Sequence, residues 1–120
     1  MKFWHAILPT LLLGACGQPK PITHEALSWV NNYYVQHPVH SLTPTAGGWL
    51  FRGARENGRE IRVGFLVPRF LNPDQAKRHA VLERVCPAKS ETIWQVLPSG
   101  NKIVISVFTD DNTFKDHVVC

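Results

Sequence analysis

A β-hairpin signal near the middle of the chain constrains the fold more than any other feature. Residues 49 to 68 read WLFRGARENGREIRVGFLVP, with Asn57-Gly58 near the centre. Asn-Gly flanked by apolar-rich segments is a strong signal for a tight turn between antiparallel strands. We therefore expect a local, antiparallel strand pair in the sheet.

Two registers compete for this hairpin. A two-residue loop mixes apolar and charged side chains on each face of the strand pair. A three-residue loop, Glu56-Asn57-Gly58, gives one apolar face and puts Gly58 in the left-handed position that such loops favour. Because register normally follows the buried face, we expect the three-residue loop. It predicts three pairs: Trp49 with Phe65, Phe51 with Val63, and Gly53 with Ile61.

The same register gathers arginines on the open side of the hairpin, namely Arg52, Arg55, Arg59 and Arg62. They oppose one another in two pairs, 52 with 62 and 55 with 59. Like charges directly across a strand pair are unfavourable unless Glu56, Glu60 or a partner's carboxylates screen them. The cluster is the foremost candidate binding surface, for an anionic protein, lipid head group or wall polymer. The alternative is a solvated face that neutralises itself.

The segment from 23 to 36 carries the first helix signal. Thr23 suits the N-cap, and Glu25 interacts favourably with the helix dipole in the first turn. Apolar residues recur at helical spacing: Ala26, Trp29, Val30, Tyr33 and Tyr34. This stripe is either part of the core or, at Trp29 and Tyr33, a second surface that docks on a partner.

A second helix is expected after Asn72. That residue suits the N-cap, Pro73 the first helical position, and Gln75 completes a capping-box pattern. Pro87 ends the helix.

The C-terminal part reads as strands at 92–97, 102–108 and 114–120, separated by polar turns. The element order is then α-β-β-α-β-β-β. It predicts a small two-layer α+β domain, in which two helices cover one face of an antiparallel sheet of about five strands.

The N-terminal 15 residues read as an export signal. Lys2 precedes a short apolar stretch from Ala6 to Ala15, about half the length that a transmembrane helix needs. The stretch leads into Leu13-Gly14-Ala15-Cys16, which resembles the lipobox of bacterial lipoproteins. The resemblance covers residues 1–17 only. It implies that residues 1–15 are removed as a signal peptide and that Cys16 is acylated on its sulfur and on its new amino group.

Lipidation makes Cys16 a membrane anchor, because several acyl chains hold a protein stably whereas one chain binds marginally. Gly17 follows the cysteine where lipoproteins retained in the inner membrane carry Asp. The resemblance therefore implies the outer membrane, with the domain facing the periplasm. Residues 16–22 contain two prolines and form a short, stiff tether. Residues 23–120 are expected to form one globular domain.

The chain has three cysteines, so lipidation of Cys16 leaves Cys86 and Cys120. Leftover thiols in an oxidising periplasm usually pair. The bridge closes a loop of about 35 residues, worth on the order of 4 kcal/mol in the chain-entropy estimate. It would pin the end of the second helix to the last strand. Two separate buried thiols or a metal pair are the alternatives.

Composition and motifs narrow the range of functions. The chain has 13 Lys and Arg against 9 Asp and Glu, a balance too weak to indicate nucleic-acid binding. No nucleophile with its base, pair of placed carboxylates or phosphate loop is recognisable, so we expect neither an enzyme nor a cofactor. We expect no metal site at His37 and His40, nor at the polar turn Asp110–Asn112, which lacks the ligand spacing of a calcium loop.

These features favour a non-enzymatic, membrane-anchored lipoprotein that binds another cell-envelope protein, in an accessory or assembly role in a secretion, conjugation or pilus system. The candidate contact residues are Arg52, Arg55, Arg59 and Arg62, with Trp29 and Tyr33 as a second patch. One alternative is a lipid-anchored inhibitor or exclusion factor acting on a lytic enzyme or an incoming element. Another is a carrier of a hydrophobic ligand, with a pocket lined by Trp49, Phe51, Phe65 and Trp94.

Overall fold

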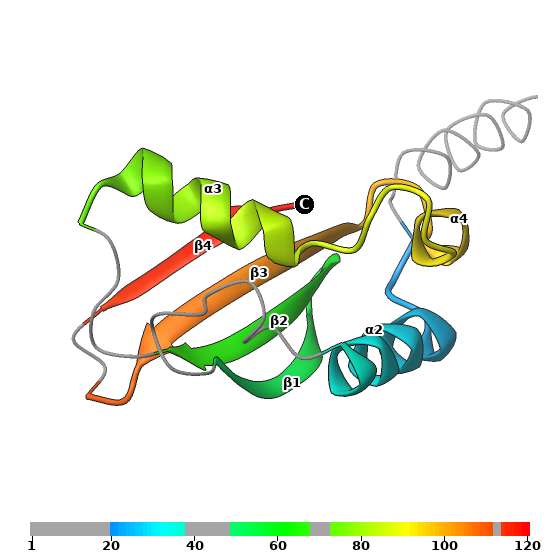
Figure 1. Ribbon diagram of the computed structural model, residues 1–120. Coiled ribbons are helices and arrows are strands. Elements are labelled where there is room, and N and C mark those ends of the chain that lie inside the picture. Colours follow the sequence, from blue (N-terminus) through cyan, green and yellow to red (C-terminus); the bar gives the residue numbers. More distant parts are fainter. Residues whose placement is uncertain (1–19, 38–48, 68–72, 112–113) are drawn as a thin grey trace, which may run out of the picture.

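The computed structural model describes residues 20–37, 49–67, 73–111 and 114–120. In chain order they form α2 (His24–Gln36), β1 (Leu50–Asn57), β2 (Glu60–Val67), α3 (Gln75–Val85), the short α4 (Ile93–Val96), β3 (Lys102–Thr109) and β4 (Lys115–Val119) (Figure 1). The protein is α+β, as predicted. Among the helices in these ranges, none has the length and apolar character needed to cross a bilayer.

Both long helices begin at side-chain caps. Thr23 accepts a hydrogen bond from the N–H three residues further on at 3.1 Å, so α2 begins where the sequence predicts. The start of α3 is later than predicted. Its N-cap is Asp74, whose carboxylate accepts from the N–H of Ala76 at 2.9 Å. Asp caps a helix as well as Asn does, and the predicted cap, Asn72, lies outside the described residues.

The described strands form one four-stranded sheet in the order β1-β2-β3-β4. β1 pairs antiparallel with β2, and β3 pairs antiparallel with β4, but the central pair of β2 and β3 is parallel. The prediction of about five antiparallel strands is therefore wrong in the number of strands and in the central pairing.

Both differences arise in the segment between β2 and β3. Residues 93–96, predicted as strand, form α4 instead, because a short apolar run does not by itself distinguish a strand from a buried helical turn. The indole N–H of Trp94 donates to the carbonyls of Pro87 and Ala88 at 3.3 and 3.0 Å and fixes this turn. With α3 and α4 between them, β2 and β3 are joined by a long crossover, the kind of connection that parallel strands require.

The loop of the β1–β2 hairpin is shorter than predicted. It consists of Gly58 and Arg59 and is closed by the pair Asn57–Glu60. Gly58 has φ +67°, which glycine adopts without strain. The three core pairs expected from a three-residue loop do not form.

A β-bulge at Arg52 explains why the two-residue loop still gives an apolar face. The bulge inserts one residue into β1, and Gly53, at φ +110°, follows it. After this shift the core side carries two cross-strand pairs, Phe51 with Phe65 and Ala54 with Val63. The sequence argument assumed a regular ladder, in which such a loop mixes the two faces.

The core lies between the helices and one face of the sheet. From the helices it takes Ala26, Val30 and Tyr34 of α2, Leu82 and Val85 of α3, and Ile93 of α4. From the central strands it takes Ile61, Val63, Phe65 and Val67 of β2, and Ile103, Ile105 and Val107 of β3. α2 lies beside β1 and α3 lies beside β4 (Figure 1). The other face of the sheet has no described helix on it, and we call it the open face.

Candidate binding surface

The open face is built from the strand residues that alternate with the core positions. Four rows of paired residues cross it: Leu50–Leu66–Phe108–Lys115, Gly53–Gly64–Ser106–His117, Arg55–Arg62–Val104–Val119, and Asn57–Glu60–Lys102. On β1 and β2, the apolar pair Leu50–Leu66 and the basic pair Arg55–Arg62 therefore lie on either side of the glycine pair Gly53–Gly64.

Two of the four predicted arginines meet on this face. Arg55 is the direct cross-strand partner of Arg62. The predicted pairs were 52 with 62 and 55 with 59, and neither forms. The bulge takes Arg52 out of the ladder, and the two-residue loop places Arg59 in the turn.

Arg55 and Arg62 line a pocket of about 330 Å³ on the open face, together with Glu56, Asn57, Gly64, Ser106 and Phe108. A Cβ built on Gly64 would lie 3.7 Å from Cε1 of Phe108, so the aromatic ring reaches over the glycine. The pocket thus has a basic end, a floor of small residues and an aromatic side. The sequence argument did not predict that Ser106 and Phe108 of β3 line this pocket. The one local signal was Gly64, because a glycine inside a strand indicates that another group approaches closely.

The charges of this pocket are incompletely paired. One terminal nitrogen of Arg62 donates to Glu60 at 3.0 Å, and Glu60 also accepts from the Asn57 amide at 3.1 Å. The Nε of Arg62 is buried and has no hydrogen-bond partner. Arg55 makes no hydrogen bond or ion pair within the described ranges. Of the two guanidinium groups, only that of Arg62 is therefore bonded to a carboxylate.

Arg59 belongs to a separate hollow at the hairpin end. This pocket, of about 480 Å³, is lined by Asn57, Gly58, Arg59, Glu60, Gly100 and Lys102. The backbone carbonyl of Arg59 accepts from the N–H of Lys102 at 3.2 Å, which ties the turn to the start of β3. The predicted arginine cluster is therefore split between the open face, the bulge and the turn.

The second predicted patch, Trp29 and Tyr33, lies on α2. Their rings are stacked at 5.0 Å between centroids, and Tyr33 is stacked in turn on His37 at 4.3 Å. Burial, followed by the nearby Glu91 carboxylate, raises the pKa of Tyr33. These residues border a pocket of about 230 Å³. Because the ring faces pack on one another, the stack offers a partner mainly ring edges.

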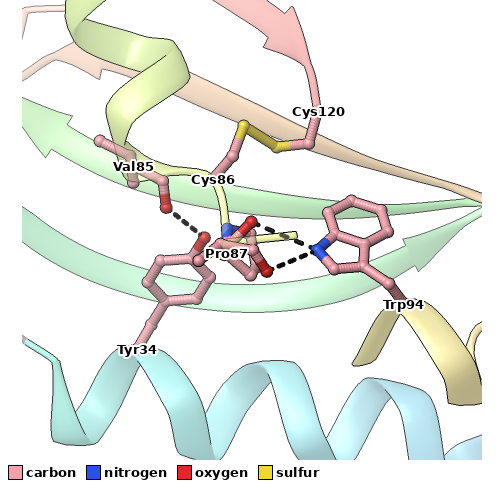
Figure 2. The surroundings of a disulfide bond; sticks show 7 residues. Tyr34, Val85, Cys86, Pro87, Trp94 and Cys120 are labelled. Atoms are coloured by element: carbon pink, nitrogen blue, oxygen red, sulfur yellow. Dashed lines mark hydrogen bonds between the residues drawn. A yellow bond between two sulfur atoms is a disulfide. The ribbon is translucent and has the colours of Figure 1, made fainter. Parts of the chain in front are cut away.

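Cys86 and Cys120 form the predicted disulfide, with Cα atoms 5.6 Å apart. It joins the end of α3 to the residue after β4, as expected. Figure 2 shows that Tyr34 and Trp94 approach the same junction from two other helices. The Tyr34 hydroxyl donates to the Val85 carbonyl at 2.6 Å. The bridge therefore sits where α2, α3, α4 and β4 meet.

The residues proposed to line a carrier pocket do not enclose one among the described residues. Trp49 and Phe65 are buried, and their ring centroids are 5.9 Å apart. Phe51 lies 5.7 Å from Phe65, so these three rings fill the core. Trp94 lies away from them on α4, with the Lys89 ammonium 4.2 Å above its ring.

A partly buried carboxylate that the sequence argument missed links α3 to β4. Asp116 accepts from His79 Nε2 at 2.9 Å, from Arg78 Nε at 3.0 Å and from the backbone N–H of His117 at 2.8 Å. Burial alone would raise the pKa of Asp116, but the hydrogen bonds from His79, Arg78 and His117 outweigh it and lower that pKa. Nothing local in the sequence marks this contact, which joins residues 37 and 38 positions apart.

The remaining sequence-based expectations concern metal ions and the lipidation site. No group of three or more His, Cys, Asp or Glu side chains in the described ranges is arranged to hold a metal ion. His40 and Asn112 lie outside those ranges, and so does the predicted lipidation site, Cys16. Asp111 accepts a hydrogen bond from the Thr109 hydroxyl at 2.8 Å within its turn.

Side chains form hydrogen bonds with backbone groups along both edges of the sheet. On β1, the Asn31 amide accepts from the N–H of Ala54 at 2.9 Å and donates to its carbonyl at 3.1 Å. On β4, the N–H of His117 is taken by Asp116. A strand that adds to a sheet edge needs these backbone groups, so both edges are partly closed to strand addition.

Comparison of the chain with protein-family models, curated proteins and solved structures finds no match. The functional assignment therefore comes from the surface itself.

Proposed function

We propose that the protein is a non-enzymatic lipoprotein, anchored in the cell envelope through Cys16, that binds another envelope protein through the open face of its sheet. The setting that we favour is an accessory or assembly role in a secretion, conjugation or pilus system. The observation that carries the proposal is the incompletely paired Arg55–Arg62 couple on a sheet face without a described helix.

The lipobox at residues 13–16 supports the anchoring part of the proposal. Ile22, six residues after Cys16 in the sequence, is buried in the core at 8% exposure. A chain of that length spans at most about 20 Å. The tether would therefore keep the domain close to the membrane, where a membrane-bound partner is locally concentrated.

The arrangement of the surface supports recognition rather than catalysis. Among the described residues, His79 contacts the carboxylate of Asp116, but Arg78 binds the same carboxylate. Both contacts tie α3 to β4. Binding surfaces of proteins are typically rich in arginine and aromatic side chains. The open face has both in Arg55, Arg62 and Phe108.

The experiment uses the full chain in its host, with a photo-crosslinking amino acid in place of Val119 and, as control, of Val35. Val119 is 52% exposed and lies in the same row of the open face as Arg55 and Arg62, so both arginines stay in place. Val35 is 70% exposed on α2 and lies away from the open face. We expect mass spectrometry to find mature protein acylated at Cys16. We also expect a discrete adduct with one envelope protein from position 119 but not from position 35.

An unmodified thiol at position 16, or a leader still attached in mature protein, would overturn the anchoring part. Equal adducts from both positions would overturn binding through the open face. An adduct with a lytic enzyme from position 119 would replace the assembly role with that of an inhibitor.

A further inference from the structure

The proposed function does not specify which chemical groups of the partner the open face binds. The edges of the sheet bear on this question, because they disfavour binding by an added strand. Asn31 occupies both backbone groups of Ala54 on β1, and Asp116 occupies the N–H of His117 on β4. An extended partner strand would have to displace these side chains. Side-chain recognition across the open face requires no such displacement.

The pocket on the open face has two unlike halves. At one end, Arg55 and Arg62 stand directly opposite each other, at the separation of about 5 Å typical of cross-strand Cβ atoms. At the other end, Phe108 continues into an apolar row with Leu66 and Leu50. Leu50 is 53% exposed. Gly64 and Ser106 leave the floor between the halves low.

The basic half has donors to spare. Glu60 engages a single terminal nitrogen of Arg62, which leaves the other terminal nitrogen as a donor, and Arg55 has no partner in the described ranges. The Nε of Arg62 also lacks a partner, but it is buried. Arginine binds carboxylates best through two parallel N–H donors, a geometry that Glu60 does not provide here. A carboxylate from outside would complete this arrangement and relieve the repulsion between the two guanidinium groups.

We propose that this pocket binds an acidic–apolar segment of the partner protein. A carboxylate side chain of that segment lies between Arg55 and Arg62, and a neighbouring apolar side chain packs against Phe108 and Leu50. The inference rests on the proposed function and names the chemistry of its partner. The volume, about 330 Å³, is at the lower end for binding pockets and suits one or two side chains.

An anionic membrane surface fits these observations less well than an acidic segment. Attraction to such a surface grows with the number of uncompensated basic residues near it. At the pocket itself, Glu56 and Glu60 stand beside Arg55 and Arg62 and offset their charge, while Lys102 and Lys115 add positive charge elsewhere on the open face. A lipid head group would also make no use of the apolar row. A single carboxylate with an apolar neighbour uses both halves.

The first test titrates the full-length chain, purified in zwitterionic detergent, with the peptide Ac-Leu-Glu-Leu-NH2 and with its Ac-Leu-Gln-Leu-NH2 counterpart. NMR follows the guanidinium signals of Arg55 and Arg62 and the amides of Gly64 and Ser106. We expect the Glu peptide to shift these signals and to bind at least about tenfold more tightly, because its carboxylate makes charge-assisted hydrogen bonds. Equal shifts with both peptides, or no shift with either, would overturn the proposal.

Two double variants of equal charge change locate the effect. Arg55→Gln/Arg62→Gln removes the basic end of the pocket, whereas Arg52→Gln/Arg59→Gln removes the two arginines that lie outside it. We expect the first pair to abolish the preference for the Glu peptide. The second pair should change binding of that peptide by less than about twofold. Equal losses in both would show that general charge, screened by salt, governs binding.

Gly64→Val fills the pocket without removing a charge. Gly64 does not have a positive φ, and the space above it admits a Cβ at ordinary contact distance. Valine suits a strand better than glycine does, so the variant should fold. We expect it to lose binding of the Glu peptide at unchanged thermal stability. Retained binding would place the peptide elsewhere.

A further arm separates the possible failures. Phosphatidylglycerol added to the micelles should not reproduce the shifts that the peptide causes. If the lipid shifts the signals of Arg55 and Arg62 and the Glu peptide does not, the open face binds lipid and the proposal is wrong. If the crosslinked partner is found but the peptide does not bind, the acidic-segment inference fails and the proposed function stands. If the peptide binds but no partner crosslinks, the proposed function fails instead.

Discussion

Tyr34 and Val85 connect the two long helices through one buried hydrogen bond, in which the Tyr34 hydroxyl donates to the Val85 carbonyl at 2.6 Å. Val85 is the last residue of α3, and the last carbonyls of a helix have no partner within it. Burial, with Tyr33 adding to it, raises the pKa of Tyr34 above its ordinary range, so the phenol keeps the proton that it donates. The Tyr34 side chain of α2 thus supplies a hydrogen-bond donor to a carbonyl at the end of α3 that has no partner within the helix.

Tyr34→Phe should therefore destabilise the protein by about 1–3 kcal/mol, because it leaves the buried Val85 carbonyl without a donor. The change is measured as the free energy of unfolding in urea. Tyr33→Phe is the matched control, since Tyr33 is only partly buried and its hydroxyl has no hydrogen bond in the described structure. The control should stay within about 0.5 kcal/mol of the wild type. Equal losses in the two variants would contradict the role given to the Tyr34 hydroxyl.

Removing the Cys86–Cys120 bridge should cost about 4 kcal/mol in the chain-entropy estimate, because the unfolded chain gains the freedom of the loop that the bridge closes. The double variant Cys86→Ala/Cys120→Ala is compared with the wild type by urea unfolding, each with and without reductant. Reductant should lower the stability of the wild type toward that of the variant and leave the variant unchanged. If the wild type does not respond to reductant, the bridge either is absent or does not stabilise the fold.

Asn31→Asp should weaken the contact between α2 and the edge of β1. The carboxylate can still accept from the N–H of Ala54, but it cannot donate to the Ala54 carbonyl. We expect a loss of about 1–2 kcal/mol in unfolding free energy. We also expect a greater tendency to associate in sedimentation experiments, because the strand edge is less protected. Asn32→Asp, an equal charge change at the exposed neighbouring position, should do neither.

The Asp116 carboxylate gives the fold a dependence on acid pH. Its pKa is lowered in the folded state, so its stabilising contribution is fully present above the unfolded pKa. The contribution is lost as the pH falls through the lower, folded pKa. We expect Asp116→Asn to be less stable than the wild type by about 2 kcal/mol at neutral pH, where it loses charge-assisted bonds to Arg78 and His79. That difference should shrink below about pH 4. Urea unfolding from pH 7 to pH 3 measures it, and a constant difference would exclude Asp116 as the source.

Local signals in the sequence predict part of this architecture well. The Thr23 cap and the spacing of Ala26, Val30 and Tyr34 place α2 within a residue, because capping and helical periodicity act over a few positions. Asn57-Gly58 predicts the hairpin. Cys86 and Cys120 pair as expected, once Cys16 is set aside by its resemblance to a lipobox.

The missed features depend on contacts that local patterns do not encode. The bulge at Arg52 shifts the register of β1, and one shifted residue moves every later side chain to the other face. α4 forms where Trp94 reaches the carbonyls of Pro87 and Ala88, a contact invisible to strand periodicity. The arginine surface was therefore predicted in kind but not in detail: Arg55 faces Arg62 rather than Arg59. Its pocket includes Ser106 and Phe108 from a strand that only the parallel pairing brings alongside.

The parallel pairing of β2 with β3 also fixes when the chain can fold. The β1–β2 hairpin is local in sequence, whereas β3 begins about 35 residues after β2 ends. Pairing across such a separation is slow, because the entropy of closing the long loop is lost before the contacts between the two strands form and stabilise the pair. Val63 and Phe65 stay without their central neighbours during that delay. Until β3 pairs, the hairpin therefore carries an unpaired apolar strand, and exposed strand edges of this kind make partly folded chains prone to aggregate.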